Sequence, residues 1–182
     1  MSMNDPIRAA PPAPKPKLRR GWRGVALDLG IAVLVFAAIT AWQGRMLVSS
    51  GAQAPDFVAQ RLDGETQRLS DLRGRKVLLY LWAPWCGVCK AMASNVASIA
   101  KGANEEELVV LPVALAYADR ADVERVAREH GIAEPLLGSE SIEDDYKVNA
   151  YPTIYVIDEE GRISRAAVGY TTWLGLKLRL LF

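Results

Sequence analysis

In the later part of the chain, continuous runs of hydrophobic residues alternate with segments in which hydrophobic residues recur at helical spacing. Residues 77–83 (VLLYLWA) and 107–117 (ELVVLPVALAY) are short, nearly continuous apolar runs. Such runs predict strands buried on both faces of a sheet, the second of them interrupted at Pro112. Between the two runs, apolar residues recur at helical spacing and predict a helix from about Cys86 to Lys101.

The remaining segments of this region continue the alternation of strands and helices. Asp119 is a suitable N-cap, and Gly131 a suitable stop, for a helix between them. The other expected elements are a hairpin and loop (55–76), a short segment (134–139), a short helix (142–148), two strands joined by an Asp-Glu-Glu-Gly turn (153–169) and a final apolar and basic stretch (171–182). Strands that alternate with helices predict an α/β fold whose sheet contains parallel pairs.

The longest apolar stretch lies near the N-terminus. Val25–Trp42 carries a single charged residue, Asp28. As a helix it would span about 27 Å, close to the apolar thickness of a bilayer, with Trp22 and Trp42 near its two ends. We expect a transmembrane anchor. A cleaved signal peptide is the alternative, because small residues near the end of the stretch suit a cleavage site.

The segment that precedes this stretch is basic and rich in proline. Residues 1–23 hold half of the ten prolines and a net charge of +5, which predicts a disordered cytoplasmic tail. The expected organisation is a tail (1–23), a transmembrane anchor (24–44), a linker (45–54) and an exported domain (55–182). The chain beyond the tail has a net charge of −4, which argues against binding to nucleic acid.

The two cysteines, Cys86 and Cys89, lie where the predicted strand meets the predicted helix. Free N–H groups and the helix dipole favour a thiolate at Cys86, in the first turn, while Cys89 lies one turn further in and is more buried. This order predicts a dithiol–disulfide switch with Cys86 as nucleophile, Cys89 as resolving thiol and no other cofactor. A structural disulfide is disfavoured, because the loop that it would close is very short.

Metal binding is the other use of two closely spaced thiols. Zinc requires four ligands, and the only histidine, His130, belongs to the last turn of a different predicted helix. We therefore expect no zinc site and an exposed His130. Two thiolates suit Cu(I), so a Cu(I)-binding module using Cys86 and Cys89 is an alternative function.

Residues 52 to about 170 resemble the thioredoxin superfamily, specifically the membrane-anchored periplasmic TlpA/ResA-like thiol–disulfide oxidoreductases. The segments that carry the resemblance are GAQAPDF, LSDLRGRKVLLYLWAPWCGVC, YKVNAYPTIYVIDEEGRI and Gly169. The ending GYTTWLGLKLRLLF is most similar to the suppressor-of-copper-sensitivity branch, which is linked to copper tolerance. The resemblance implies a thioredoxin fold, a central mixed β-sheet flanked by helices, after one N-terminal transmembrane helix. It also implies a single-pass protein of the bacterial inner membrane with its C-terminal domain in the periplasm.

The resemblance further implies a substrate-binding backbone opposite the cysteines. Pro152 matches the cis-proline of the family, which faces the cysteine pair. A cis X-Pro bond makes a fixed tight turn, and it leaves the backbone of Tyr151 free to pair with an extended substrate segment.

Four residues beside or between the cysteines complete the expected site. Trp82 and Trp85 match the aromatic residues that precede the first cysteine in the family. We expect Trp82 in the core and Trp85 as a flat apolar contact surface for substrate. Gly87 and Val88 lie between the cysteines, where they are expected to contact substrate and to tune the reduction potential.

The chain departs from the family at the positions that assist the second cysteine. Thioredoxins carry a buried acid where this chain has Tyr80, and ResA-like proteins carry a glutamate where it has Met92. A helix-kinking proline of the family is replaced by Ser94. The proton of Cys89 is therefore left to Tyr80, Lys90 or water, among which the sequence does not choose.

The expected partners follow from this chemistry. Protein thiols and disulfides are the substrates, and a membrane electron-transfer partner is needed if the net direction is reduction. A re-oxidising partner is needed if the net direction is oxidation. A copper-stress-linked adaptor that uses the same fold as a docking surface is a further alternative. A peroxidase is disfavoured, because Ala83 stands where the peroxiredoxin nucleophile requires a threonine.

Overall fold

The computed structural model describes residues 27–31, 33–35 and 47–181. They fall in two compact units, residues 1–37 and residues 38–182, and the described part of the first unit is helical. The predicted tail (1–23) lies outside the described residues, as does most of the predicted anchor (24–44). Within the described ranges, no helix is long and apolar enough to cross a bilayer.

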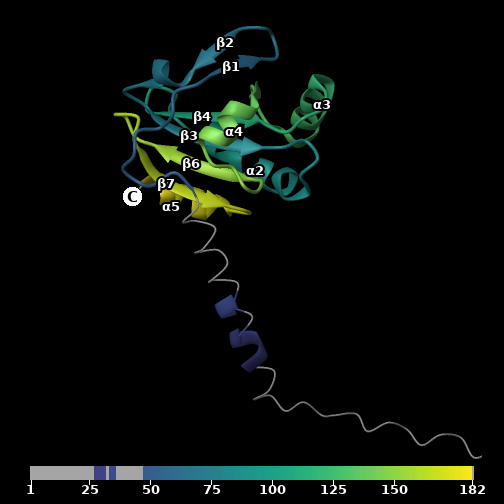
Figure 1. Ribbon diagram of the computed structural model, residues 1–182, viewed down its shortest axis with the longest axis vertical. Coiled ribbons are helices and arrows are strands. Elements are labelled where there is room, and N and C mark those ends of the chain that lie inside the picture. The colour runs from purple at the N-terminus through teal and green to yellow at the C-terminus, as the bar shows by residue number, and fades with distance from the viewer. Residues whose placement is uncertain (1–26, 32, 36–46, 182) are drawn as a thin grey trace, which may run out of the picture. The chain divides into compact units, whose positions relative to one another are not determined.

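Residues 47–181 form a domain around a seven-stranded sheet in the order β2-β1-β5-β4-β3-β6-β7 (Figure 1). The strands are β1 (Val58–Arg61), β2 (Thr66–Arg68), β3 (Lys76–Trp82), β4 (Leu108–Ala114), β5 (Leu136–Leu137), β6 (Thr153–Ile157) and β7 (Ile163–Val168). β4 is parallel to both of its neighbours, β3 and β5, and the other adjacent pairs are antiparallel. The predicted mixed α/β sheet is confirmed.

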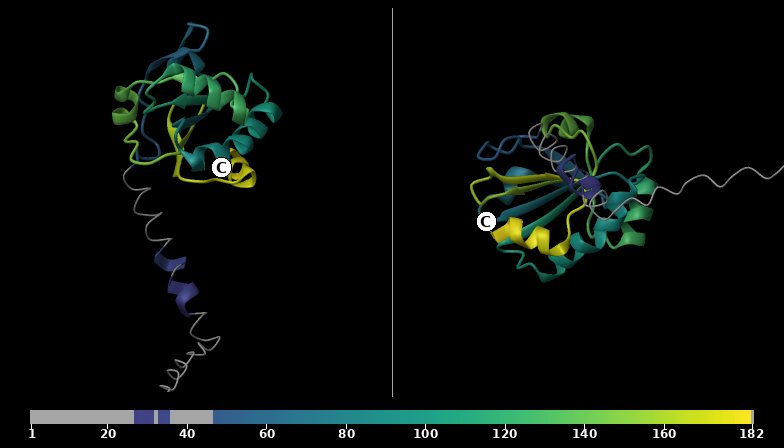
Figure 2. Two further views of the ribbon diagram at one scale, coloured as in Figure 1. Left: turned by 90° about the vertical axis from the view of Figure 1, so that its right-hand side faces the viewer. Right: turned by 90° about the horizontal axis from the view of Figure 1, so that it is seen from below.

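Helices cover both faces of this sheet. They are α2 (Gly87–Gly102), α3 (Arg120–His130), α4 (Glu140–Asp145) and α5 (Trp173–Leu181), with a 3-10 turn η1 (Leu69–Leu72). Along β3, Leu78, Tyr80 and Trp82 point to the core shared with α2, α3 and α5. The alternate residues, among them Leu79 and Leu81, point to the core shared with η1 and α4. Figure 2 shows α2 and α5 on the side of the sheet opposite to α4.

The ends of the helices follow from local sequence. The Asp119 carboxylate accepts a hydrogen bond from the Ala121 N–H at 3.0 Å, which caps α3. Gly131 ends α3 in the left-handed conformation at φ 69°, where a side chain would be strained. The predicted cap and stop of α3 are therefore confirmed. The helix predicted from about Cys86 to Lys101 is confirmed as α2.

The expected interruption of the second buried strand at Pro112 is wrong. β4 runs without a break, and Pro112 pairs in register with Tyr80 of β3. The Leu115 N–H donates to the Trp82 carbonyl, on the β3 side, and backbone direction alternates along a strand. The nitrogen of Pro112, which has no hydrogen to donate, therefore faces the β5 side. There β5 pairs only with the last two residues of β4, so no ladder bond is lost.

Residues 47–54, which fall within the predicted linker, pack on the sheet. Leu47 and Ala54 are each 4% exposed and belong to the core beneath β6. The Val48 N–H donates to the Tyr155 hydroxyl at 3.3 Å, and the Gly51 N–H donates to the Ile163 carbonyl at 2.7 Å. The chain is thus fixed to the domain from Leu47 onward.

Gly138 has no room for a side chain. A Cβ there would lie 2.5 Å from Leu115 Cδ2 and 2.7 Å from Val113 Cγ1, both on or next to β4. We expect Gly138→Ala to lower the free energy of unfolding by about 2 kcal/mol, as overpacking of a dense core does. Gly102→Ala, where a Cβ meets nothing within 4 Å, is the matched control and should leave stability unchanged or raised. Chemical denaturation of the three chains would measure the difference; equal stabilities would contradict the close packing.

Candidate active site

The two cysteines lie at the junction between β3 and α2. Cys86 is the N-cap of α2, with φ −79° and ψ 110°, and its Sγ accepts a hydrogen bond from the Cys89 N–H at 3.1 Å. The Cys86 N–H in turn donates to the Ala83 carbonyl at 3.1 Å, which closes the turn out of the strand. Because a helix N-terminus presents free N–H groups, negative charge on the Cys86 sulfur is stabilised there.

Cys86 and Cys89 form a disulfide, with their Cα atoms 5.3 Å apart. Cys86 is 6% exposed, whereas Cys89 is fully buried among the residues of α2 and β3. The sulfur of Cys86 is therefore the one that an incoming group reaches first, in the order expected from the sequence.

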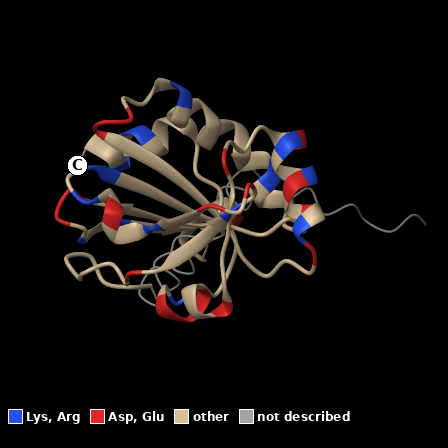
Figure 3. Cartoon of the chain, turned by 90° about the horizontal axis from the view of Figure 1, so that it is seen from above, with Lys and Arg blue, Asp and Glu red and all other residues tan. Residues whose placement is uncertain are grey.

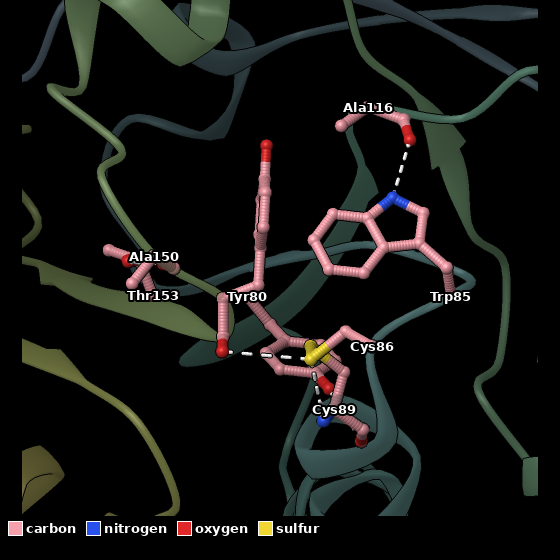
Figure 4. The surroundings of a disulfide bond; sticks show 8 residues. Tyr80, Trp85, Cys86, Cys89, Ala116, Ala150 and Thr153 are labelled. Atoms are coloured by element: carbon pink, nitrogen blue, oxygen red, sulfur yellow. Dashed lines mark hydrogen bonds between the residues drawn. A yellow bond between two sulfur atoms is a disulfide. The ribbon is translucent and has the colours of Figure 1, made fainter.

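A proline turn lies opposite the disulfide. The Tyr151–Pro152 peptide bond is cis, as the resemblance implies. The Tyr151 carbonyl oxygen lies 3.6 Å from Cys86 Sγ, and the Thr153 hydroxyl donates to the Ala150 carbonyl at 2.7 Å, within the same turn (Figure 4). The Pro152 carbonyl accepts from the Gly169 N–H at 2.8 Å, at the start of the chain's path to α5. The turn thus holds one backbone carbonyl beside the sulfur of Cys86.

Trp85 forms an exposed apolar surface next to Cys86. Its side chain is 65% exposed, but its indole N–H donates to the Ala116 carbonyl at 2.8 Å. Its ring meets the Tyr151 ring edge to face, with centroids 5.6 Å apart (Figure 4). These two contacts hold an exposed apolar ring in one orientation beside Cys86. Trp82, by contrast, is fully buried, as expected.

Gly87 and Val88 occupy the exposed side of the first turn of α2. Val88 is 45% exposed, and a Cβ at Gly87 would meet nothing within 4 Å. With Trp85 they leave the approach to Cys86 open and largely apolar. The structure therefore brings together all seven residues that the sequence singled out for the site: Cys86, Cys89, Trp85, Gly87, Val88, Tyr151 and Pro152.

Cys89 lies in a largely apolar buried cluster that includes the hydroxyl of Tyr80. Tyr80 is fully buried, and its hydroxyl donates to the Cys89 carbonyl at 2.9 Å. Burial raises the pKa of Tyr80 above its ordinary value, so that this phenol stays protonated at any physiological pH. Met92, at the place of the family's glutamate, is also fully buried. The Tyr80 hydroxyl is thus engaged in a hydrogen bond with the backbone of Cys89.

Ala116 also belongs to the site, although no pattern in the sequence indicates it. This residue has φ 48°, which is unusual for a residue other than glycine, and it directs its carbonyl to the Trp85 indole. Every residue has a carbonyl, and the sequence LAYAD gives no turn signal, so the contact was not predictable.

Metal ligands are not clustered at this site. Within the described residues, no group of three or more histidine, cysteine, aspartate or glutamate residues is placed to hold a metal ion. His130 is the last residue of α3, as expected, but it is half-buried, so the expectation of an exposed side chain is wrong.

Comparison with known proteins supports the same chemistry. Residues 50–166 match the model of the AhpC/TSA family. The thioredoxin-like protein YneN of Bacillus subtilis is 32% identical over 153 residues, which cover 79% of this chain and 89% of the relative. The thiol-disulfide oxidoreductase ResA of the same organism is 26% identical over 158 residues, which cover 82% and 88%.

Solved structures share the fold. The exposed lipoprotein thioredoxin Etrx1 of Streptococcus pneumoniae matches with a TM-score of 0.61 and 30% identity, covering 70% of this chain and 98% of that one. A thioredoxin-family thiol:disulfide interchange protein from Chlorobium tepidum matches with a TM-score of 0.66, covering 74% and 97%. At 18% identity, the second likeness concerns the fold alone.

The hydroxyl of Tyr80 should contribute measurably to stability. Tyr80→Phe removes one buried hydrogen bond to the Cys89 carbonyl, and we expect a loss of about 1 kcal/mol in the free energy of unfolding. Tyr170→Phe is the control, because that hydroxyl is in an exposed contact with Asn95, and it should cost less than about 0.5 kcal/mol. Denaturant unfolding of the oxidised chains would compare them. An equal effect of the two substitutions would show that the buried bond is not stabilising.

Proposed function

Since the chain belongs to the AhpC/TSA family and is a thioredoxin-like thiol–disulfide oxidoreductase of the TlpA/ResA type, we propose that it exchanges disulfides with proteins in the periplasm through Cys86 and Cys89. The observation that carries the proposal is the position of Cys86 as N-cap of α2, bonded to Cys89 and facing the cis-proline turn. That position gives one sulfur both a stabilised charge and an open approach.

The proposed exchange conserves atoms and electrons. In the reducing direction, the Cys86 thiolate attacks a substrate disulfide, forms a mixed disulfide and releases one substrate thiolate, which takes up a proton. The Cys89 thiolate then attacks Cys86 Sγ, closes the Cys86–Cys89 disulfide and releases the second substrate sulfur. The substrate gains two electrons and the protein loses two. The oxidising direction is the same sequence reversed.

The residues around the disulfide have separate roles in this proposal. The Cys89 N–H lies 3.1 Å from Cys86 Sγ and stabilises the Cys86 thiolate. This thiolate is the attacking group in the reducing direction and the leaving group in the oxidising direction. The backbone of Tyr151 lies where an extended substrate segment crosses the disulfide, and Trp85 and Val88 offer it an apolar surface. Recognition through backbone and apolar contact suits many protein substrates rather than one small molecule.

We further propose that the chain is a single-pass protein of the bacterial inner membrane with this domain in the periplasm. The support is the apolar stretch Val25–Trp42 and the basic segment before it. In that location a membrane electron-transfer partner would reduce the Cys86–Cys89 disulfide. The C-terminal sequence GYTTWLGLKLRLLF supports a place in the suppressor-of-copper-sensitivity branch, and thus a link to copper tolerance.

Substitution of the two cysteines should affect disulfide exchange in different ways. Cys86→Ser should abolish exchange with a disulfide substrate, because the nucleophile is lost. Cys89→Ser should instead accumulate mixed disulfides on Cys86, because no thiol remains to displace the substrate. Non-reducing gels of the two variants after incubation with a disulfide-bonded protein would separate these outcomes. Equal trapping by both variants would reverse the proposed order of attack, and full activity of both would exclude the proposed function.

The apolar surroundings of Cys89 should limit the second step at neutral pH. A buried thiol without a nearby positive charge or proton acceptor is disfavoured as thiolate, so that resolution should accelerate as pH rises. Met92→Glu places a carboxylate where ResA-like relatives have one, and we expect it to speed resolution by roughly tenfold near pH 7. Met92→Gln is the control of equal shape that takes up no proton.

Rapid-mixing kinetics of a preformed mixed disulfide would measure this step. Equal rates for Met92→Glu and Met92→Gln, with a fast parent chain, would show that another group accepts the proton. Lys90→Gln would then be the next variant to measure.

A further inference from the structure

The helix α5 presents leucines on two sides. Leucine occupies alternate positions from Leu174 to Leu180, and on a helix with 3.6 residues per turn this repeat divides the leucines between two sides. Leu176 is fully buried and Leu180 is half-buried in the core shared with α2. Leu174 and Leu178, in contrast, are 58% and 48% exposed. Packing on the domain therefore accounts for only part of the apolar surface of α5.

The exposed residues of α5 form one continuous surface. At 100° per residue, Leu174, Leu178 and Leu181 lie within about 60° of one another around the helix. Trp173 and Lys177 border this arc, and the Lys177 ammonium lies 4.3 Å from the centre of the Trp173 ring. These five residues are called here the outer face of α5. Leucines bordered by tryptophan and lysine are typical of helices that lie in a membrane interface.

The charge of α5 has one sign. The helix carries Lys177 and Arg179 and no acidic residue. Other helices differ in charge: α3 carries both acidic and basic residues, and α4 carries acidic residues alone (Figure 3). A cationic helix with exposed leucines is complementary to a surface that is anionic and apolar beneath, which describes a bilayer containing anionic phospholipid.

The chain enters the domain at the end where α5 lies. The first described segment of the domain, coloured dark blue, and the yellow α5 lie at the same end of the domain in Figure 1 and in the left view of Figure 2. Leu47 is buried in the core, and the apolar stretch of the predicted anchor (24–44) ends at Trp42. Five residues of extended chain reach at most about 18 Å, so an anchored domain would hold this end close to the bilayer.

We propose that the outer face of α5 binds the surface of an anionic phospholipid bilayer, with its leucines among the headgroups. The proposal rests on the membrane location proposed above. Because α5 packs along α2, and Cys86 is the N-cap of α2, this contact fixes the orientation of the redox site relative to the membrane. A membrane electron-transfer partner would then meet Cys86 from a constant direction.

The test uses the full chain reconstituted in vesicles of phosphatidylcholine with about one-third phosphatidylglycerol, part of it with brominated acyl chains that quench tryptophan. Comparison of the parent chain with Trp173→Phe and with Trp42→Phe gives the share of quenching due to each tryptophan. We expect quenching at Trp173, reduced about threefold in pure phosphatidylcholine.

Leu174→Ser combined with Leu178→Ser should remove the quenching of Trp173. Val58→Ser, on β1 and 45% exposed, is the matched control and should retain it. Quenching at Trp42 without quenching at Trp173 would overturn the proposal while leaving the anchor intact. Quenching at Trp173 without quenching at Trp42 would support the proposal and contradict the predicted transmembrane anchor. Cross-linking of α5 to a second copy or another protein, with Trp173 unquenched, would assign the face to that partner and overturn the proposal.

Discussion

The chemistry of the molecule depends on the abrupt passage from a fully buried strand to the first turn of a helix. β3 is covered on both faces and paired on both edges, so its end is fixed to the packing of the whole core. The Cys86 N–H bonds back to the Ala83 carbonyl, and the next turn of chain is already helical. The sulfur of Cys86, at the junction of strand and helix, therefore accepts a hydrogen bond from a backbone N–H, and no side chain is needed as donor. Loosening β3 would move the donor and the sulfur together.

The opposite wall of the site has a different source of rigidity. Tyr151 meets Trp85 edge to face, and Trp85 is tied to the backbone of Ala116, which follows β4. The turn at Pro152 is in turn bonded to Gly169, beyond β7. Strands from both sides of β3 therefore set the width of the approach to Cys86. The two walls consist largely of backbone groups and aromatic rings, which suits the recognition of protein substrates proposed above.

Much of this arrangement could be predicted from the sequence, because it depends on local patterns. The apolar run at 77–83 and the helical spacing after it placed Cys86 at a strand-to-helix junction, and Asp119 and Gly131 bounded a helix. What could not be predicted depends on neighbours distant in sequence. Pro112 is accommodated because β5 is short. The Ala116 carbonyl reaches Trp85 because Ala116 has a positive φ, which no sequence pattern predicts.

The shortness of β5 has a consequence for solubility. β5 pairs only with Val113 and Ala114, so the stretch 108–112 of β4 has no strand beside it on that edge within the described chain. An unpartnered strand edge is a template on which other chains can polymerise. Pro112 lies at the boundary of that edge and offers an incoming strand no donor, so the ladder of a foreign chain would be broken at its first step. The missing N–H of Pro112 thus disfavours the addition of a foreign strand at this edge of the sheet.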